Sequence, residues 1–252
     1  MKKFLKDNWK FLLFVLLGGL IGGYFLGLYE YDVLSPEVLN QLQEQNVTKE
    51  MVAISTMFQY GITFGVVLAS IGIILSKKTN LWKEFKVNKK AIIATTIITI
   101  VAALTLFPGD KLIFGQFNSW INNQYTTSPT ISKIIGGLLV GGIIEEVMLR
   151  LFFMSLLVFI SSKLFYKNKK EITTKIYVIA NITSTLIFAA GHIPATMAMT
   201  TLTPIIIVRC FLFNGGLGLG FGYLYRKYGL GYAMIAHGFA HLISDILMII
   251  FI

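Results

Sequence analysis

The chain has 252 residues, of which 55% are hydrophobic and only 13% charged, whereas about a quarter of the residues are charged in a soluble domain. This composition excludes an ordinary soluble domain and predicts an all-α, polytopic membrane helix bundle whose first partner is the lipid bilayer. The formal net charge of +10 does not indicate a nucleic-acid partner, because the lysines gather at the ends of apolar runs and no aromatic residues alternate with a basic stripe.

The first 130 residues contain three apolar runs, at 11–28, 52–75 and 91–107. Each is long enough to cross a bilayer. The first run begins like a signal peptide, but no small-residue cleavage site precedes a polar region, so we expect a retained span. A weakly amphipathic loop follows the third run. No motif is recognisable in residues 1–130, which we interpret as three spans and their loops.

Four more apolar runs follow, at 131–165, 176–193, 204–225 and 230–252. The run 131–165 is too long for one straight span of about 20 residues. It is either one tilted, over-long helix or two pieces that meet near Glu145, and the second alternative gives eight spans.

The basic residues favour seven spans in a single membrane domain. With seven spans and the N-terminus in the cytoplasm, every basic loop of a multi-pass protein of the cell membrane lies on the cytoplasmic side. An eighth span would invert the later loops. These residues are Lys77, Lys78, Lys83, Lys86, Lys89 and Lys90 in one loop, Lys163, Lys167, Lys169, Lys170 and Lys175 in a second, and Arg226 and Lys227 in a third.

A pair of glutamates interrupts the run 131–165. In a helix, Glu146 and Arg150 share a face and can pair, whereas Glu145 points about 100° away from Glu146. Ionisable groups inside a membrane usually face a protein interior or a wet cavity and carry function. Glu145, without a local partner, is therefore a candidate general base. The alternative for Glu146 and Arg150 is an ion pair that only joins helices.

All three histidines also lie in apolar runs. A lone histidine such as His192 is more often a satisfied core residue, but His237 and His241 are four apart on one helix face, with Asp245 one turn later. This spacing can hold a metal ion, although Gly238 replaces the glutamate that follows the first histidine of a zinc-peptidase helix. The alternative zinc ligands are Glu145, His192, His237 and His241.

The order Glu-Glu-x-x-x-Arg, Phe-x-x-x-His and His-x-x-x-(Asn or Asp) is the motif pattern of the CAAX protease and bacteriocin-processing family, also called the Abi family. The chain resembles this family over residues 131–252, which we expect to form a catalytic core similar to the type II CAAX prenyl endopeptidases. The flanking residues 222–230 and 233–237 look similar too. The matching motif residues are Glu145, Glu146, Arg150, Phe188, His192 and His237.

One position departs from the family pattern. His241 stands where asparagine or aspartate is usual, and Asp245 keeps the spacing only when counted from His241. Because the flanking residues fit His237 as the first member of the motif, we interpret His241 as a replacement at the fourth catalytic position.

The resemblance implies an intramembrane endopeptidase of the glutamic type without a cofactor, the metalloprotease with zinc being the alternative. Glu145, oriented by His192, would take a proton from the attacking water. His237, with His241 in place of asparagine, would donate hydrogen bonds to the oxyanion of a peptide or membrane-protein substrate. The implied catalytic set is Glu145, Glu146, Arg150, His192, His237 and His241.

Two other functions stay open. The departure at His241 favours a non-proteolytic bacteriocin self-immunity or membrane scaffold protein. A small transporter or channel could relay protons through the buried glutamates and histidines, although the repeated halves common in transporters are not visible. Arg209 also lies in a span, where we expect an ion pair rather than contact with a substrate carboxylate.

The catalytic hypothesis sets a geometric condition. If the span 176–193 begins at the cytoplasmic face, His192 lies about 24 Å along its helix, whereas His237 lies only about 10–12 Å from that face. The two rings meet at Glu145 only if the helix of His192 is tilted, short or begins outside the membrane.

Overall fold

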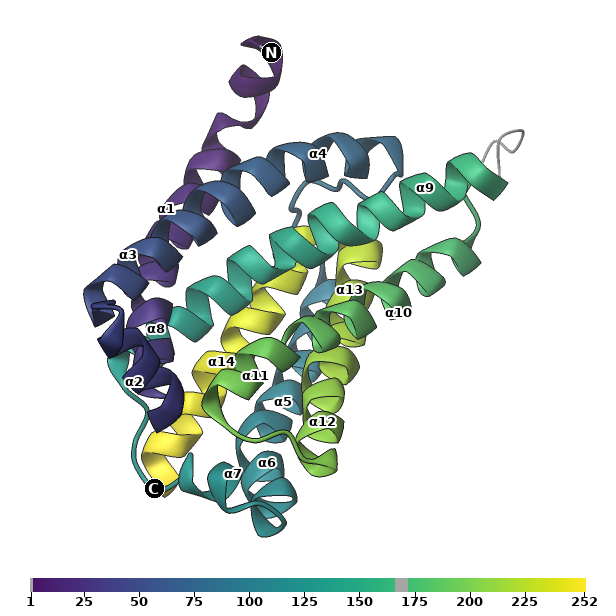
Figure 1. The fold of residues 1–252 in the computed structure, drawn as a ribbon. Coiled ribbons are helices and arrows are strands. Elements are labelled where there is room, and N and C mark those ends of the chain that lie inside the picture. Colours follow the sequence, from purple (N-terminus) through teal and green to yellow (C-terminus); the bar gives the residue numbers. More distant parts are fainter. Residues whose placement is uncertain (1, 166–171) are drawn as a thin grey trace.

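The computed structural model describes residues 2–165 and 172–252, and in these ranges every regular element is a helix (Figure 1). The predicted all-α membrane bundle is therefore confirmed. Lys167, Lys169 and Lys170, counted among the basic loop residues above, lie outside the described residues.

Within the described residues, six helices are long and apolar enough to span a membrane. A seventh long helix, Ile131 to Phe165, is unbroken, so the alternative of one over-long helix holds and the two-piece alternative does not. Its centre is less apolar than the other spans because the two glutamates and an arginine lie there. The six are Lys2–Asp32, Lys49–Lys78, Lys89–Gln116, Thr174–Met199, Pro204–Tyr228 and Leu230–Phe251.

The elements are α-helical stretches (α) and shorter π- or 3₁₀-helical stretches (η). The first half of the chain holds α1 (Lys2–Asp32), α2 (Pro36–Glu44), α3 (Lys49–Phe58), η1 (Gln59–Val67), α4 (Leu68–Lys78), α5 (Lys89–Leu104), η2 (Thr105–Gly109), α6 (Asp110–Leu112), η3 (Phe114–Gln116) and α7 (Ser119–Asn123). The second half holds α8 (Ile131–Gly136), η4 (Gly137–Glu145), η5 (Val147–Met154), α9 (Ser155–Phe165), α10 (Thr174–Gly191), α11 (Ile193–Met199), α12 (Pro204–Cys210), η6 (Phe211–Leu217), α13 (Gly218–Tyr228) and α14 (Leu230–Phe251).

The helices begin and end at residues suited to those positions. Asn88 and Thr130 cap α5 and α8, accepting hydrogen bonds from the backbone N–H of Ala91 and Lys133 at 3.1 and 3.2 Å. Gly229 ends α13 with a φ of 107°, a left-handed conformation that glycine adopts without strain.

The chain passes back and forth along the bundle. Figure 1 shows the N-terminus and the connections α4–α5 and α13–α14 at one end, with the C-terminus at the opposite end. We call the first end the basic end, because Lys77, Lys83, Arg226 and Lys227 lie there. This arrangement agrees with seven spans and basic loops on one side, whereas the assignment of that side to the cytoplasm stays a prediction.

The long helix Ile131 to Phe165 runs through the largest buried cluster of the described residues. Ile144, Val147 and Leu151 on this helix belong to that cluster and are almost fully buried. Other members come from helices far apart in the sequence: Val15 of α1, Ile73 of α4, Leu224 of α13 and Ala233 of α14.

Two glycines allow η4 and α14 to cross at backbone contact. A Cβ atom at Gly142 would lie 2.7 Å from the Cα atom of Gly238, closer than packed atoms approach. Small residues permit such crossings in membranes. The crossing lies next to Glu145 on one helix and His237 on the other, so it fixes the separation of these side chains.

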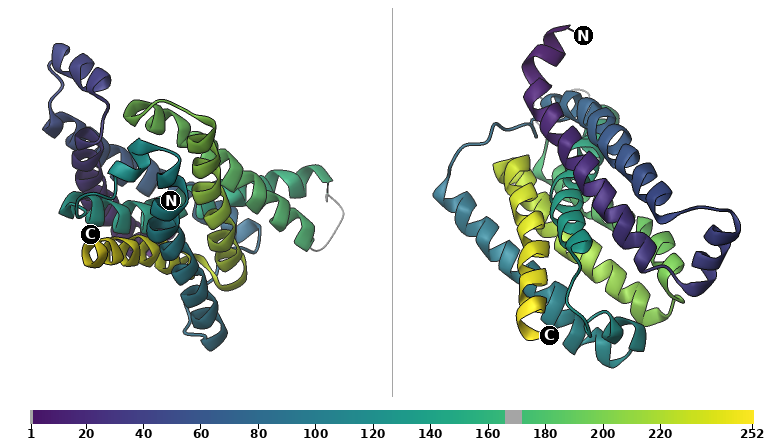
Figure 2. Two further views of the ribbon diagram at one scale, coloured as in Figure 1. Left: turned by 90° about the horizontal axis from the view of Figure 1, so that it is seen from below. Right: turned by 90° about the vertical axis from the view of Figure 1, so that its left-hand side faces the viewer.

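The direction of α10 allows His192 to meet His237 at Glu145, as the catalytic hypothesis requires. Figure 1 and the view from below in Figure 2 show α9 and α10 extending side by side away from the rest of the bundle. The α10 helix thus begins away from the rest of the bundle, and its C-terminal end, about 27 Å along an 18-residue helix, is where His192 approaches Glu145.

A buried ion pair joins the end of the third span to the sixth. Both oxygens of Asp110 accept hydrogen bonds from Arg209, at 2.6–2.9 Å, and the Tyr125 hydroxyl donates to Asp110 Oδ2 at 2.5 Å and contacts Leu106 O at 3.0 Å. Asp110 is fully buried. Arg209 is thus held by an ion pair, as expected for a charged residue in a span.

Candidate active site

Three helices bring one carboxylate and two imidazoles together. Glu145 is the last residue of η4, His192 caps the C-terminus of α10, and His237 lies in the second turn of α14. Glu145 Oε1 is 3.9 Å from His192 Nε2, and Glu145 Oε2 is 3.7 Å from His237 Nε2. The side chains of Glu145, His192 and His237 are 19%, 33% and 10% exposed, so the cluster is recessed and not sealed.

Glu146 contributes a second carboxylate on the buried side of His237. Its Oε1 is 2.9 Å from His237 Nδ1, and its Oε2 is 3.3 Å from Arg150 Nε. Arg150 Nη2 also donates to the carbonyl of Gly218 at 2.9 Å. Glu146 and Arg150 are 0% and 1% exposed, so this charged pair is placed entirely inside the bundle.

The hydrogen bonds assign the protons of both rings. His192 Nδ1 lies 3.0 Å from the carbonyl of Phe188, which can only accept, so Nδ1 carries a proton. His237 Nδ1 donates to the Glu146 carboxylate by the same reasoning. In their neutral forms both rings then present unprotonated Nε2 atoms to Glu145. The Glu145 carboxylate and the two Nε2 atoms are then three acceptors that face one another. Such a group needs a shared proton, a water molecule that donates to it, or a cation.

The His241 ring lies beside the His237 ring. The rings of His237 and His241 stack at 5.2 Å with an interplanar angle of 26°. A Cβ atom at Gly141 would lie 2.9 Å from His241 Cδ2, so this ring covers the glycine face of η4. Asp245 instead pairs with Lys133 at 3.0 Å. This geometry favours the interpretation of His241 as a replacement at the fourth motif position.

The prediction without a cofactor and the alternative with zinc both stay predictions. In the part of the chain that the structure describes, no three His, Cys, Asp or Glu side chains come together with metal-binding geometry. Each His Nε2 lies 3.7–3.9 Å from Glu145, and His237 Nδ1 is held by Glu146.

A family comparison covers the same region. Residues 127–243 match the family described as Rce1-like: Type II CAAX prenyl endopeptidase Rce1-like. This part of the chain is an Rce1-like domain. The comparisons with curated proteins and with solved structures gave no match. The predicted family resemblance is confirmed over these residues, and the apolar helices agree with a multi-pass membrane protein.

All six candidate residues lie inside the Rce1-like domain. The structure brings Glu145, Glu146, Arg150, His192 and His237 into one connected set of contacts. The sixth residue, His241, stacks on His237. The sequence did not reveal Phe221, whose ring stacks on His237 at 4.4 Å and 15°. His237 is therefore held between Phe221 and His241. An aromatic residue in an apolar, glycine-rich run carries no signal that separates this role from ordinary packing.

Proposed function

We propose that this protein is a glutamic-type intramembrane endopeptidase that hydrolyses a peptide bond of a membrane-associated peptide or protein. The observation that carries the proposal is the Glu145 carboxylate between the Nε2 atoms of His192 and His237, inside an Rce1-like domain. The substrate is expected to reach the site from the membrane or its surface, because the site lies among membrane-spanning helices.

Glu145 is the general base in this proposal. A water molecule shared by Glu145 and His192 Nε2 gives a proton to the carboxylate as its oxygen attacks the scissile carbonyl. His192 keeps its Nδ1 proton on the Phe188 carbonyl, which leaves Nε2 free to accept from the same water. The proton on Glu145 then passes to the leaving amine, so the carboxylate is regenerated and the peptide bond is hydrolysed.

His237 stabilises the oxyanion. Donation from Nε2 requires a proton on both ring nitrogens, and the Glu146 carboxylate at Nδ1 supplies the compensating negative charge. Such fixed charges stabilise a transition state most where water is scarce. His241, at the usual asparagine position, adds a second ring beside the one that donates.

Glu146 and Arg150 act as positioning residues. Arg150 holds one Glu146 oxygen and the Gly218 carbonyl, and the other Glu146 oxygen fixes the plane of the His237 ring. Neither residue needs to touch the substrate.

The test uses the purified chain in liposomes. Substrates are a prenylated CAAX peptide, the same peptide without the prenyl group, and a mixed library of membrane peptides, with products identified by mass spectrometry. Glu145→Gln keeps the shape of the side chain and should lower cleavage by about 10²–10⁴-fold, the usual contribution of a general base. Glu50→Gln, an exposed glutamate in α3, is the matched control.

Cleavage at the wild-type rate by Glu145→Gln would contradict the proposal. His241→Asn, which restores the family residue, should cleave at least as fast as the wild type. The departure at His241 is also the observation that favours the second candidate, a non-proteolytic immunity or scaffold protein. That function would survive Glu145→Gln, and no peptide would be cleaved by the wild type or by His241→Asn.

A further inference from the structure

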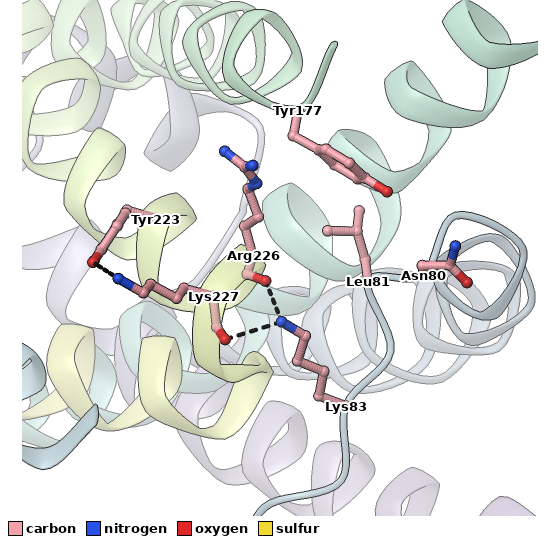
Figure 3. A pocket seen from close by; sticks show the side chains of 7 residues that line it. All are labelled: Asn80, Leu81, Lys83, Tyr177, Tyr223, Arg226 and Lys227. Carbon is pink, nitrogen blue, oxygen red and sulfur yellow. Dashed lines mark hydrogen bonds between the residues drawn. The ribbon is translucent and has the colours of Figure 1, made fainter. Parts of the chain in front are cut away.

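A cavity lies at the basic end of the bundle, on different side chains from those around Glu145. It has a volume of about 490 Å³, which is within the range of about 300–1,000 Å³ typical of small-molecule sites. It opens between the α4–α5 connection, the start of α10 and the end of α13 (Figure 3). Its lining residues are Asn80, Leu81, Lys83, Tyr177, Tyr223, Arg226 and Lys227.

The cavity collects positive charge without a carboxylate. Three of its seven lining residues are cations, and none is acidic. Among residues 2–165 and 172–252, no ion pair involves Lys83, Arg226 or Lys227. Burial and the neighbouring Arg226 guanidinium lower the pKa of Lys83 below its usual value. An anion in the cavity would relieve this repulsion.

Backbone contacts hold the Lys83 side chain next to the end of α13, which carries the other two cations. Lys83 Nζ donates to the carbonyls of Arg226 and Lys227 at 2.5 and 2.9 Å, which caps the C-terminus of α13 (Figure 3). The left-handed turn at Gly229 brings the α4–α5 connection close, since a Cβ there would lie 3.1 Å from Lys83 Cβ.

The three side chains keep further donors beside these contacts. Arg226 uses Nη2 to bond Thr174 at 2.8 Å and lies over the Tyr177 ring at 5.1 Å. Lys227 donates to the Tyr223 hydroxyl at 3.0 Å. A guanidinium has five N–H donors and an ammonium three, so these contacts leave donors on all three side chains for an anionic ligand.

We propose that this cavity binds the phosphate group of an anionic phospholipid headgroup. Arginine and lysine donors both commonly bind phosphate in proteins. Basic pockets between membrane helices are suited to lipid headgroups, and tyrosines prefer the membrane–water interface. The position at the helix ends places the cavity at the depth of headgroups, whereas a soluble anion would need no such depth.

The proposal is tested on the full chain in a nonionic detergent, independently of any peptidase activity. Native mass spectrometry measures binding of phosphatidylglycerol and of phosphatidylcholine with the same acyl chains. Arg226→Gln with Lys227→Gln removes two cavity cations, and Lys89→Gln with Lys90→Gln removes two exposed cations from the same end of the bundle. Thermal unfolding in phosphatidylcholine shows whether each variant is folded. The single variant Lys227→Gln removes one cavity cation and changes only an exposed side chain, so it tests the cavity if the double variant does not fold.

The wild type should bind phosphatidylglycerol in preference to phosphatidylcholine. The cavity variant should bind it about 25-fold more weakly, fivefold for each basic residue, which corresponds to about 1 kcal/mol each. The variant at residues 89 and 90 should stay close to the wild type. Equal losses in both double variants, equal binding of the two lipids, or stabilisation by sodium phosphate as strong as by phosphatidylglycerol at matched ionic strength would each overturn the lipid assignment.

Discussion

Replacing Gly141 by alanine places one methyl group against the imidazoles and leaves every candidate catalytic residue in the chain. The new Cβ would lie 2.9 Å from His241 Cδ2 and 3.4 Å from His237 Nε2. Carbon atoms pack at about 3.5–4.0 Å, so the His241 ring must move by about 0.6–1.1 Å. The stacked His237 ring is displaced with it.

The expected result is a large loss of cleavage with a small change in stability. A misplacement of about 1 Å can cost on the order of 10²-fold in rate. Overpacking costs about 1–3 kcal/mol, and replacing a helical glycine by alanine returns about 0.5–1 kcal/mol. We therefore expect kcat/KM to fall about 100-fold while the free energy of unfolding falls by about 2.5 kcal/mol or less.

The matched control is Gly137→Ala, one turn earlier on η4. A Cβ there would touch His241 at 3.4 Å, close to ordinary contact, so this variant should cleave at nearly the wild-type rate. Cleavage is measured in liposomes on a peptide that the wild type cuts, and unfolding by thermal denaturation. A folded Gly141→Ala protein with full activity, or an equal loss in Gly137→Ala, would refute the reasoning.

Arg150→Met removes the guanidinium from the buried Glu146 carboxylate and should destabilise the fold by about 3–5 kcal/mol, whereas adding Glu146→Gln should restore part of that loss in a double-mutant cycle of thermal unfolding. Asp110→Asn should cost a similar amount by leaving Arg209 unpaired, but should not lower the rate of the folded fraction. Burial and Asp110 raise the pKa of Tyr125 above its usual value of 10, so the folded state holds this proton more tightly than the unfolded chain. The stability that this provides is present below pH 10 and is lost as the pH rises beyond it; Tyr125→Phe should flatten this part of the stability profile.

Local spacing predicted the contacts that lie within one helix. Glu146 and Arg150 are four residues apart, and their ion pair follows from helix geometry alone. The motif order predicted that Glu145, His192 and His237 would meet. The direction of α10, which allows the three side chains to meet, could not be predicted, because a sequence shows the length of an apolar run and not its tilt.

Contacts between distant helices left weaker signals. Arg209 was expected to be paired, but its partner Asp110 lies 99 positions earlier, in a segment that the sequence indicated only as a loop. The bond from His237 to Glu146 spans 91 positions and was not predicted, because the spacing had already assigned Glu146 to Arg150. Burial makes such partners necessary, yet only the packing of α14 on η4 selects which ones meet.

The two buried charge clusters differ in how fully their polar atoms are satisfied. Both oxygens of Asp110 accept hydrogen bonds, and Arg209 is paired through two nitrogens, as expected where a charge only joins helices. Around Glu146 the described residues leave Glu146 Oε2 and two Arg150 nitrogens without a hydrogen bond of good geometry. A buried ion pair of this kind rarely stabilises a fold more than apolar residues would. The Glu146–Arg150 pair is therefore better explained by its role in orienting the His237 ring toward Glu145 than by a contribution to the stability of the fold.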